Sequence, residues 1–338
     1  MRLGQSAVVA TLSLTLLGAP MGVDGQPTLK MPRIGYLCAV TCGARPPIAG
    51  ADPLPIDLFS RALEALGYVD GRNIKIEYFP PEQAEPEQRG RLAEELVRRQ
   101  VNVIFVAGES ATALAARNAT STIPIVIAVS GDPVGVGLVK SLARPGGNVT
   151  GVTYLREQVA TKGLELLKEV VPRMSRVAVL VDPTDPAHPR MLKELEARAR
   201  GLGVRLRPVE TRAPTDFQAA FSAMVKDQVG GFVLLAGSNH LFHGSRIAYL
   251  ALTNRLAAVS SFKEFAEVGG LLTYGPNARE LLTRAAAFVD RILKGARPGD
   301  LPIEQPTTFE LVINLKTAKT LGLTIPPTVL ARADKVIQ

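Results

Sequence analysis

The sequence has no tryptophan and few aromatic residues of any kind. Of its 338 residues, 5% are aromatic, three are His and two are Cys. Surfaces that bind nucleic acid combine basic side chains with aromatic ones, and zinc sites draw on clustered His and Cys. The scarcity of these residue types argues against both kinds of site.

The charge is basic but not clustered. Lys and Arg number 39 against 31 Asp and Glu, which gives a formal net charge of +8. The basic residues stand singly or in pairs such as Arg98 and Arg99, without a run. We therefore interpret the charge as a solvated surface and predict no nucleic-acid partner. The hydrophobic content of 46% is that of a globular protein, and the length suggests two domains.

The longest apolar segment lies at the N-terminus and is short. Arg2 precedes an apolar stretch over residues 7–17, which small residues and the polar Asp24 follow. This order is typical of a secretory signal, and the stretch is too short to span a bilayer. We predict that residues 1–26 are a signal peptide and that the mature protein is periplasmic.

Export would affect the redox state of the two cysteines, Cys38 and Cys42. An oxidising compartment permits a disulfide, which here would close a very small loop and stabilise little. The three histidines are far away in sequence, so we favour a local disulfide or two free thiols over a metal site. The sequence leaves these two alternatives open.

Strand and helix patterns alternate in two successive runs along the chain. Continuous apolar stretches such as 101–107 and 231–236 are typical of strands buried on both faces of a parallel sheet. The first run predicts strands at 33–37, 74–78, 101–107 and 124–129, with helices near 58–66, 92–97 and 111–117. The second predicts strands at 177–181, 204–209, 231–236 and 257–259, with helices over 191–202, 217–225 and 242–255. The fold class is therefore α/β, with two doubly wound parallel-sheet lobes.

The sequence also predicts how one of these helices is capped. Thr215 and Gln218 have the spacing of a capping box. We expect the Thr215 side chain to cap the helix over 217–225.

Two turn-rich segments are candidates for crossings between the lobes. They are 144–151, with a Pro and paired Gly, and 273–276. The tail adds a strand at 309–314 and a helix near 315–321. We predict a first lobe of residues 32–150 with about 275–297, and a second lobe of 151–274 with about 298–338.

Small polar residues follow the predicted strands of both runs. Ligands of open parallel sheets bind beyond the carboxyl ends of the strands. The residues at these ends are Glu109 and Ser110, Ser130 and Asp132, Asp182, Ser238 and Asn239, and Ser261 with Phe262. Helix N-termini there suit a carboxylate, and Asp132 or Asp182 suits an ammonium group. Each residue alone is more simply a cap or turn former, but their gathering at one edge favours a ligand site.

Catalytic and metal-binding alternatives are weaker. Asp182 and Asp185 each precede a proline and suit turns, and Ser238 is too close to His240 along the chain for a nucleophile and base pair. His240 and His243 have helical spacing, yet no third metal ligand is evident. Gly131–Gly137 lacks the nucleotide-binding patterns. We therefore predict no catalytic residue, no metal and no cofactor.

Several long motifs, in order, resemble one family from residue 32 to the C-terminus. They are LGYVDGRNI (66–74), STIPIV (121–126), GDPVG (131–135), LARPGGNVTG (142–151), GGLLTYGP (269–276) and FELVINLKTAK (309–319). With these motifs the chain resembles the periplasmic substrate-binding proteins of ABC transporters of the tryptophan/tyrosine type.

The resemblance implies a type I periplasmic-binding-protein fold whose two lobes are joined by crossing segments and close on a small ligand. Relatives of this type bind aromatic or other amino acids. Carried over by position, the ligand-binding residues are Glu109, Ser110, Ser130, Asp132, Asp182, Ser238, Asn239, Ser261, Phe262 and Tyr274.

We therefore expect a monomeric, non-enzymatic binding protein. It would deliver an amino acid or related small carboxylate to an inner-membrane ABC permease with its ATPase. Two alternatives remain at this point. One is an exported hydrolase or epimerase on the same architecture, and the other is a ligand-sensing partner of a membrane receptor.

Overall fold

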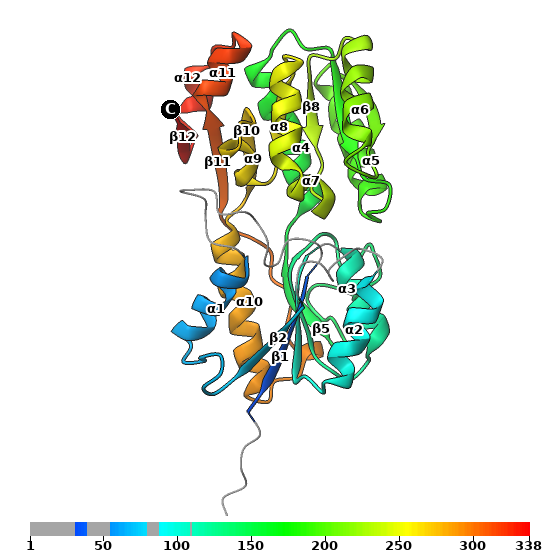
Figure 1. Cartoon of the computed structure of the whole chain (residues 1–338), viewed down its shortest axis with the longest axis vertical. Coiled ribbons are helices and arrows are strands. Elements are labelled where there is room, and N and C mark those ends of the chain that lie inside the picture. The colour runs from blue at the N-terminus through cyan, green and yellow to red at the C-terminus, as the bar shows by residue number, and fades with distance from the viewer. Residues whose placement is uncertain (1–30, 39–54, 80–87, 109) are drawn as a thin grey trace, which may run out of the picture. The chain divides into compact units, whose positions relative to one another are not determined.

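The computed structural model describes residues 31–38, 55–79, 88–108 and 110–338. The predicted signal peptide, residues 1–26, lies outside the described residues. Residues 32–338 form one compact unit that contains two β-sheets (Figure 1).

The first sheet has five parallel strands in the order β2-β1-β3-β4-β5. Their bounds are β1 Arg33–Cys38, β2 Lys75–Tyr78, β3 Val103–Ala107, β4 Ile125–Ser130 and β5 Val149–Thr153. Strand β3, with the sequence VIFVA, is buried along its whole length, as a strand covered on both faces must be. The predicted strand positions are confirmed to within two residues.

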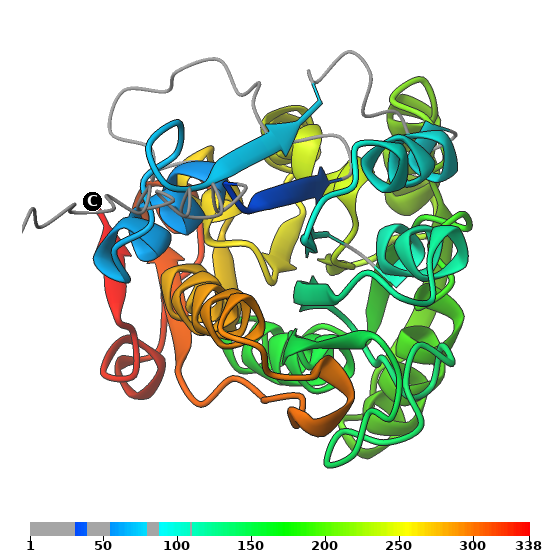
Figure 2. The same cartoon turned by 90° about the horizontal axis from the view of Figure 1, so that it is seen from below.

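Helices cover both faces of this sheet. On one face, α1 (Pro55–Ala65) and α10 (Ala278–Leu293) lie side by side although they are far apart in sequence (Figure 2). On the other face lie α2 (Arg89–Arg98) and α3 (Ser110–Ala119). Helix α10 presents an apolar stripe at helical spacing, and the side chain of Asn277 caps it by accepting from the Glu280 N–H at 2.9 Å.

The second sheet has seven strands in the order β12-β11-β10-β9-β8-β6-β7. Their bounds are β6 Arg176–Val181, β7 Arg205–Glu210, β8 Gly231–Leu234, β9 Ala257–Ser260, β10 Leu272–Pro276, β11 Phe309–Asn314 and β12 Lys335–Ile337. All neighbours are parallel except β10 and β11, which pair antiparallel. This pairing follows because the chain leaves the sheet at the end of β10 and re-enters it in the opposite direction at β11.

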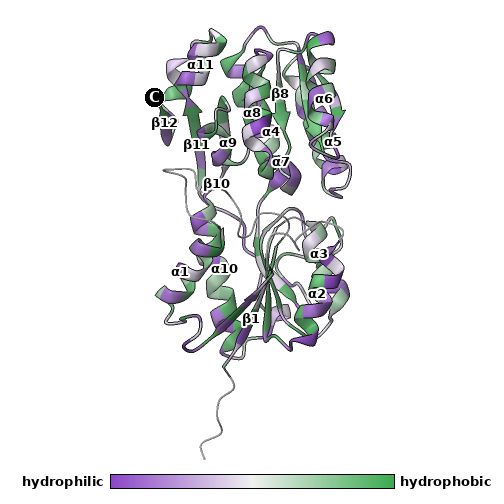
Figure 3. Ribbon diagram, in the orientation of Figure 1, coloured by the Kyte–Doolittle hydropathy of each residue, from purple (hydrophilic) through white to green (hydrophobic). Residues whose placement is uncertain are grey.

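Helices also cover both faces of the second sheet. One core contains residues of α4 (Arg156–Val170), α5 (His188–Gly201), α11 (Leu315–Leu321) and α12 (Pro327–Leu330). The opposite core contains residues of α6 (Asp216–Lys226), α8 (Gly244–Thr253) and α9 (Lys263–Glu267). Figure 3 shows the alternation of polar and apolar positions along these helices, with apolar strands such as β8 between them. No helix in the described part of the chain is long and apolar enough to cross a bilayer.

Three segments connect the two sheets, and we call the part of the chain around each sheet a lobe. The first crossing follows β5, the second lies between β10 and α10, and the third leads from Glu304 to β11. The sequence places the first crossing by Gly151 and the third near residue 298. In the structure each lies a few residues later, because β5 continues to Thr153 and residues 298–304 still pack on the first lobe. Ile303 belongs to a first-lobe core, and its N–H donates to Leu142 O.

The helix expected over 242–255 is confirmed as α8 to within two residues, and a short helix that the sequence did not predict, α7 (Ser238–Phe242), precedes it. One local prediction is wrong in detail. The Thr215 side chain makes no cap hydrogen bond. Instead, the carboxylate of Asp216 accepts from the N–H groups of Arg212 and Ala213, so the turn before α6 is closed by a carboxylate.

Candidate functional site

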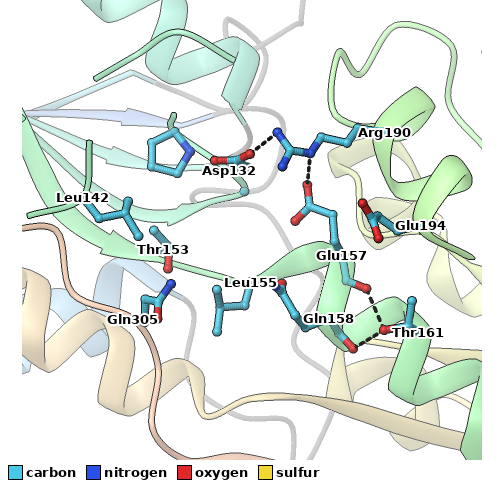
Figure 4. Close-up of a pocket in the computed structure, with 12 residues that line it drawn as sticks. Asp132, Leu142, Thr153, Leu155, Glu157, Gln158, Thr161, Arg190, Glu194 and Gln305 are labelled. Carbon is cyan, nitrogen blue, oxygen red and sulfur yellow. Dashed lines mark hydrogen bonds and ion pairs between the residues drawn. The ribbon is translucent and has the colours of Figure 1, made fainter. Parts of the chain in front are cut away.

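A cavity of about 290 Å³ lies between the two lobes beside the crossing segments (Figure 4). The first lobe supplies the segment after β4, and the second supplies α4 and α5. We call it the hinge cavity, and its lining consists of Gly131, Asp132, Pro133, Leu142, Thr153, Leu155, Glu157, Gln158, Thr161, Arg190, Glu194 and Gln305. Of the predicted ligand-binding residues that the structure describes, Asp132 is the one that lines it.

An arginine joins the lobes at this cavity. Arg190, in the first turn of α5, forms an ion pair with Asp132, and its Nε lies 3.9 Å from Glu157 Oε1 (Figure 4). The other oxygen of Asp132 accepts from the Val134 N–H at 3.1 Å, which fixes the carboxylate toward α5. Burial raises the pKa of Glu157 above its ordinary value.

A second, fully buried ion pair lies at the start of α4. Arg156 Nη1 donates to Asp185 Oδ2 at 2.8 Å, and the two side chains are 3% and 2% exposed. Burial alone would raise the pKa of Asp185, but the charge of Arg156 and the hydrogen bond from the Ala187 N–H outweigh it and hold that pKa below its ordinary value. The carboxylate is therefore ionised and positions the first turn of α4 against the segment after β6.

The two lobes approach closely at Gly131. A Cβ added there would lie 3.1 Å from Arg156 Cδ and 3.5 Å from Ser110 Oγ. Gly131 follows β4, and Ser110 is the first, fully buried residue of α3. Residues from the carboxyl ends of β3 and β4 and from the first crossing thus converge on one point, and a side chain at position 131 would crowd Arg156.

Two buried histidines stack beside this region. The rings of His188 and His240 are 6.0 Å apart and nearly parallel. His188 Nδ1 accepts from the Asp182 N–H, so its Nε2 carries the proton toward Ala236 O. His240 Nδ1 lies 2.9 Å from Leu235 O and must donate, which leaves Nε2 to accept from the Thr211 hydroxyl.

These contacts decide the role of His240. Burial lowers its pKa to about 4, so the ring is neutral at physiological pH. It is a core histidine, and within the described ranges no group of three His, Cys, Asp or Glu side chains is arranged to hold a metal ion. Both ring nitrogens of His240 have partners within the core, so its role is structural.

A third contact between the crossings and the second sheet involves Tyr154. Its hydroxyl donates to Ser261 O at 2.9 Å, and its ring lies 6.3 Å from that of Phe262. Phe262 also lines a cavity of about 110 Å³ in the second lobe and packs against a core of the first lobe. Phe262 therefore contacts both lobes.

The remaining predicted residues divide into two groups. Ser130 ends β4 and Ser238 begins α7, so both lie at carboxyl ends of strands as expected. Glu109 lies outside the described residues. Asp182, Asn239 and Tyr274 have other partners. The Asp182 carboxylate accepts from the Thr184 N–H and hydroxyl, Asn239 donates to Arg212 O, and Tyr274 stacks on Phe309 at 5.7 Å.

The sequence interpretation missed Arg190, Glu157, Arg156 and Tyr154. All four belong to, or face, the first crossing, which the sequence placed a few residues too early. For Arg156 and Glu157, the signal that could have found them is the polar run 156–158, which follows the predicted strand 149–154 and Leu155. Arg190 had no local signal, because only the packing of α5 against α4 brings it to Asp132.

Cys38, at the end of β1, is disulfide-bonded. The other cysteine of the sequence, Cys42, lies outside the described residues. This selects the disulfide from the two alternatives that the sequence leaves open, and it suits an oxidising compartment.

Two α/β lobes with polar residues at the facing strand ends define a class of binding protein that holds its ligand between lobes. Over residues 56–337 the chain matches the family described as ABC transporter substrate binding protein. Because the match covers most of its length, the chain belongs to that family.

Individual relatives agree. The chain is 29% identical to a tyrosine-binding protein of Clostridioides difficile (strain R20291) over 268 residues, which are 78% of this chain and 75% of that protein. It resembles the structure of an ABC domain from Streptococcus pneumoniae in complex with L-Trp, with a TM-score of 0.80, 24% identity, and 90% and 99% of the two chains covered. A conserved domain protein from Vibrio cholerae O1 biovar El Tor gives a TM-score of 0.81 at 27% identity, with 91% and 100% covered.

These matches settle the class. The fold is that of type I periplasmic binding proteins. The chain is the solute-binding component of an ABC transporter, a non-enzymatic, extracytoplasmic protein, and this role implies a small ligand and a permease with its ATPase. The hydrolase or epimerase alternative is thereby excluded.

Proposed function

We propose that the ligand is an amino acid or a closely related small carboxylate, bound between the lobes at the carboxyl ends of the strands. The observation that carries this proposal is the convergence of Ser110, Gly131 and Arg156 at one point between the lobes. The tyrosine-binding relative supports the ligand class.

Each part of such a ligand has a suitable partner. The N-terminus of α3 and the Ser110 hydroxyl suit the carboxylate, because the first N–H groups of a helix have no partners within it. Ser130 ends β4 in the first lobe, and Ser238 and Asn239 follow β8 in the second, so both lobes place polar residues at strand ends. For the ligand ammonium we favour Asp182, which follows β6, over Asp132. Asp132 already pairs with Arg190, whereas Thr184 occupies only one oxygen of Asp182.

The body of the ligand would pack on an aromatic ring beside Ser261. We favour Phe262 over Tyr274 for this role, because the ring of Tyr274 already stacks on Phe309 with an interplanar angle of 9°. Phe262 contacts both lobes through Tyr154 and the first-lobe core. Its position therefore couples ligand contact to lobe closure.

In the cell, we propose, residues 1–26 direct the chain to the periplasm and the mature protein works there as a monomer. Ligand binding closes the two lobes about the three crossing segments. The closed form then docks on the inner-membrane permease and delivers its ligand.

Calorimetric titration of the mature protein with amino acids and short carboxylates tests this proposal. A ligand should bind at one site per chain, and Ser110→Ala and Phe262→Ala should each weaken its binding by about tenfold or more. Ser222→Ala is the matched control, because Ser222 is exposed on α6 and its hydroxyl donates only to the helix carbonyl of Gln218. Equal affinity in all three variants would contradict the proposed site.

A further inference from the structure

The hinge cavity differs from the point where Ser110, Gly131 and Arg156 converge. Of these three residues, Gly131 lines the cavity, whereas Ser110 and Arg156 do not. Its walls include Thr153 and Leu155 of the first crossing and Gln305 of the third. Neither Ser110 nor Phe262 lines it. The cavity thus lies against the segments about which the lobes would move.

The lining of the hinge cavity is negatively charged. Asp132, Glu157 and Glu194 are carboxylates, and Arg190 is the one basic residue among the twelve that line it. Arg190 is already committed to Asp132. Two negative charges are therefore left over at the wall that α4 and α5 form.

Glu157 is the unusual member of this group. The residue is 8% exposed, and no group in the described part of the chain donates a hydrogen bond to its buried Oε1. The nearest cation is Arg190 Nε at 3.9 Å, which is too long for a hydrogen bond. A buried carboxylate oxygen without a donor costs free energy, and a donor brought by a ligand would remove that cost.

We propose that the hinge cavity is a second binding site, which takes a small organic cation with its ammonium group at Glu157. Glu194 lies on the same wall and adds a second acceptor at the cavity rim (Figure 4). An anion would instead meet three carboxylates and a guanidinium that already has a partner. The charge of the lining therefore selects a cation.

The size and apolar lining define the ligand further. A volume of about 290 Å³ is at the lower end of the range for ligand sites, which suits a molecule of few heavy atoms. Leu142, Leu155 and Pro133 provide an apolar wall for a short methylene chain, and Gln158 and Gln305 provide amides. A short alkyl diamine has this combination of charge and chain.

Occupancy of this site would affect the main site. The cation would contact α4 and α5 of the second lobe, Asp132 of the first, and both crossings. It therefore favours the arrangement of the lobes in which Arg190 meets Asp132, and a ligand that favours one arrangement shifts the equilibrium toward it. The inference does not depend on the identity of the ligand at the main site.

Calorimetric titration with 1,4-diaminobutane tests the inference on the mature protein. We expect saturable binding at one site per chain at constant ionic strength, and none with the uncharged 1,4-butanediol. Glu157→Gln should weaken diamine binding by about tenfold or more, because it keeps the size of the side chain and removes its charge. Glu194→Gln should weaken it by a smaller factor, and its exposed position avoids any risk to folding.

The matched control is Glu165→Gln. Glu165 lies on the same helix, α4, but its carboxylate pairs with Lys162 and Arg198 outside the cavity. This variant should bind the diamine as the wild type does. Absence of saturable binding by the wild type, or equal weakening by Glu157→Gln and Glu165→Gln, would overturn the inference.

Competition separates the two sites. Ser110→Ala should leave diamine affinity unchanged, and saturating main-site ligand should change it by a limited factor only. If the apparent diamine affinity keeps falling in proportion to the amino-acid concentration, the two ligands compete for one shared site. This result would also overturn the inference. Failure of amino-acid binding with intact diamine binding would count against the proposed function alone.

Discussion

Arg156 and Asp185 form an ion pair 2.8 Å long in which neither side chain is more than 3% exposed. It ties the first residue of α4, directly after the first crossing, to the turn that leads into α5. Because both charges are buried, each depends on the other for compensation.

Removal of one partner should therefore be costly. Arg156→Met leaves the Asp185 carboxylate buried without its main counter-charge, and we expect the free energy of unfolding to fall by about 3–5 kcal/mol. Urea denaturation at pH 7 measures this. Arg207→Met is the control, because the Arg207–Asp227 pair is 62% and 38% exposed and should contribute less than about 1 kcal/mol. A loss for Arg156→Met no larger than that of the control would contradict the assigned role.

His240 should make the protein sensitive to mild acid. The unfolded chain takes up a proton at this residue below a pH of about 6.5, whereas burial delays uptake in the folded protein until the pKa of about 4. Acid in this window therefore favours the unfolded state, and the stabilisation present above pH 6.5 is lost as the pH falls toward 4. We expect a loss of about 3 kcal/mol from this group.

Denaturation curves between pH 7 and pH 4 for the wild type and for His240→Gln check this. The variant should start less stable and show a shallower decline. Asp185 does not account for the same window. Its pKa is lowered, so its contribution is present above the unfolded value near 3.9 and is lost only as the pH falls below that. If the free energy of unfolding falls equally steeply with pH in both proteins, His240 is not the cause.

Gly151 should be intolerant of any side chain. Its φ is +130°, and an added Cβ would lie 2.1 Å from Ile127 O on the neighbouring strand β4. Gly151→Ala must shift β4 or β5 next to the first crossing, and we expect a loss of about 3 kcal/mol or more in the free energy of unfolding. Gly147→Ala is the control, since nothing lies within 4 Å of its added Cβ. The melting temperature of Gly151→Ala should be far below that of Gly147→Ala. Equal melting temperatures would refute the steric argument.

Much of the fold follows from local sequence patterns. Strands such as β3 and β6 are continuous apolar stretches, and the predicted tail, strand 309–314 with helix 315–321, coincides with β11 and α11. Asn314 and Gly322 explain this agreement, because the first caps α11 through the Thr317 N–H and the second ends it with a φ of +70°. Such caps act within a few residues and are visible in the sequence.

Other features could not be predicted from a single local pattern. The capping hydrogen bond expected from Thr215 is absent, and the carboxylate of Asp216 accepts instead from the N–H groups of Arg212 and Ala213 in the turn before α6. The side chain of His240 is buried against Thr211, which lies far from it in the sequence, so no local pattern reveals this contact. The hinge cavity needs α5 packed on α4, which no local pattern encodes.

The central claim is that an amino acid or small carboxylate binds between the lobes. Isothermal titration of the mature protein against the twenty amino acids and a set of short carboxylates tests it most directly. We predict that at least one binds at one site per chain, with a Kd of about 1 μM or tighter. Absence of binding by every member of the set would contradict the claim.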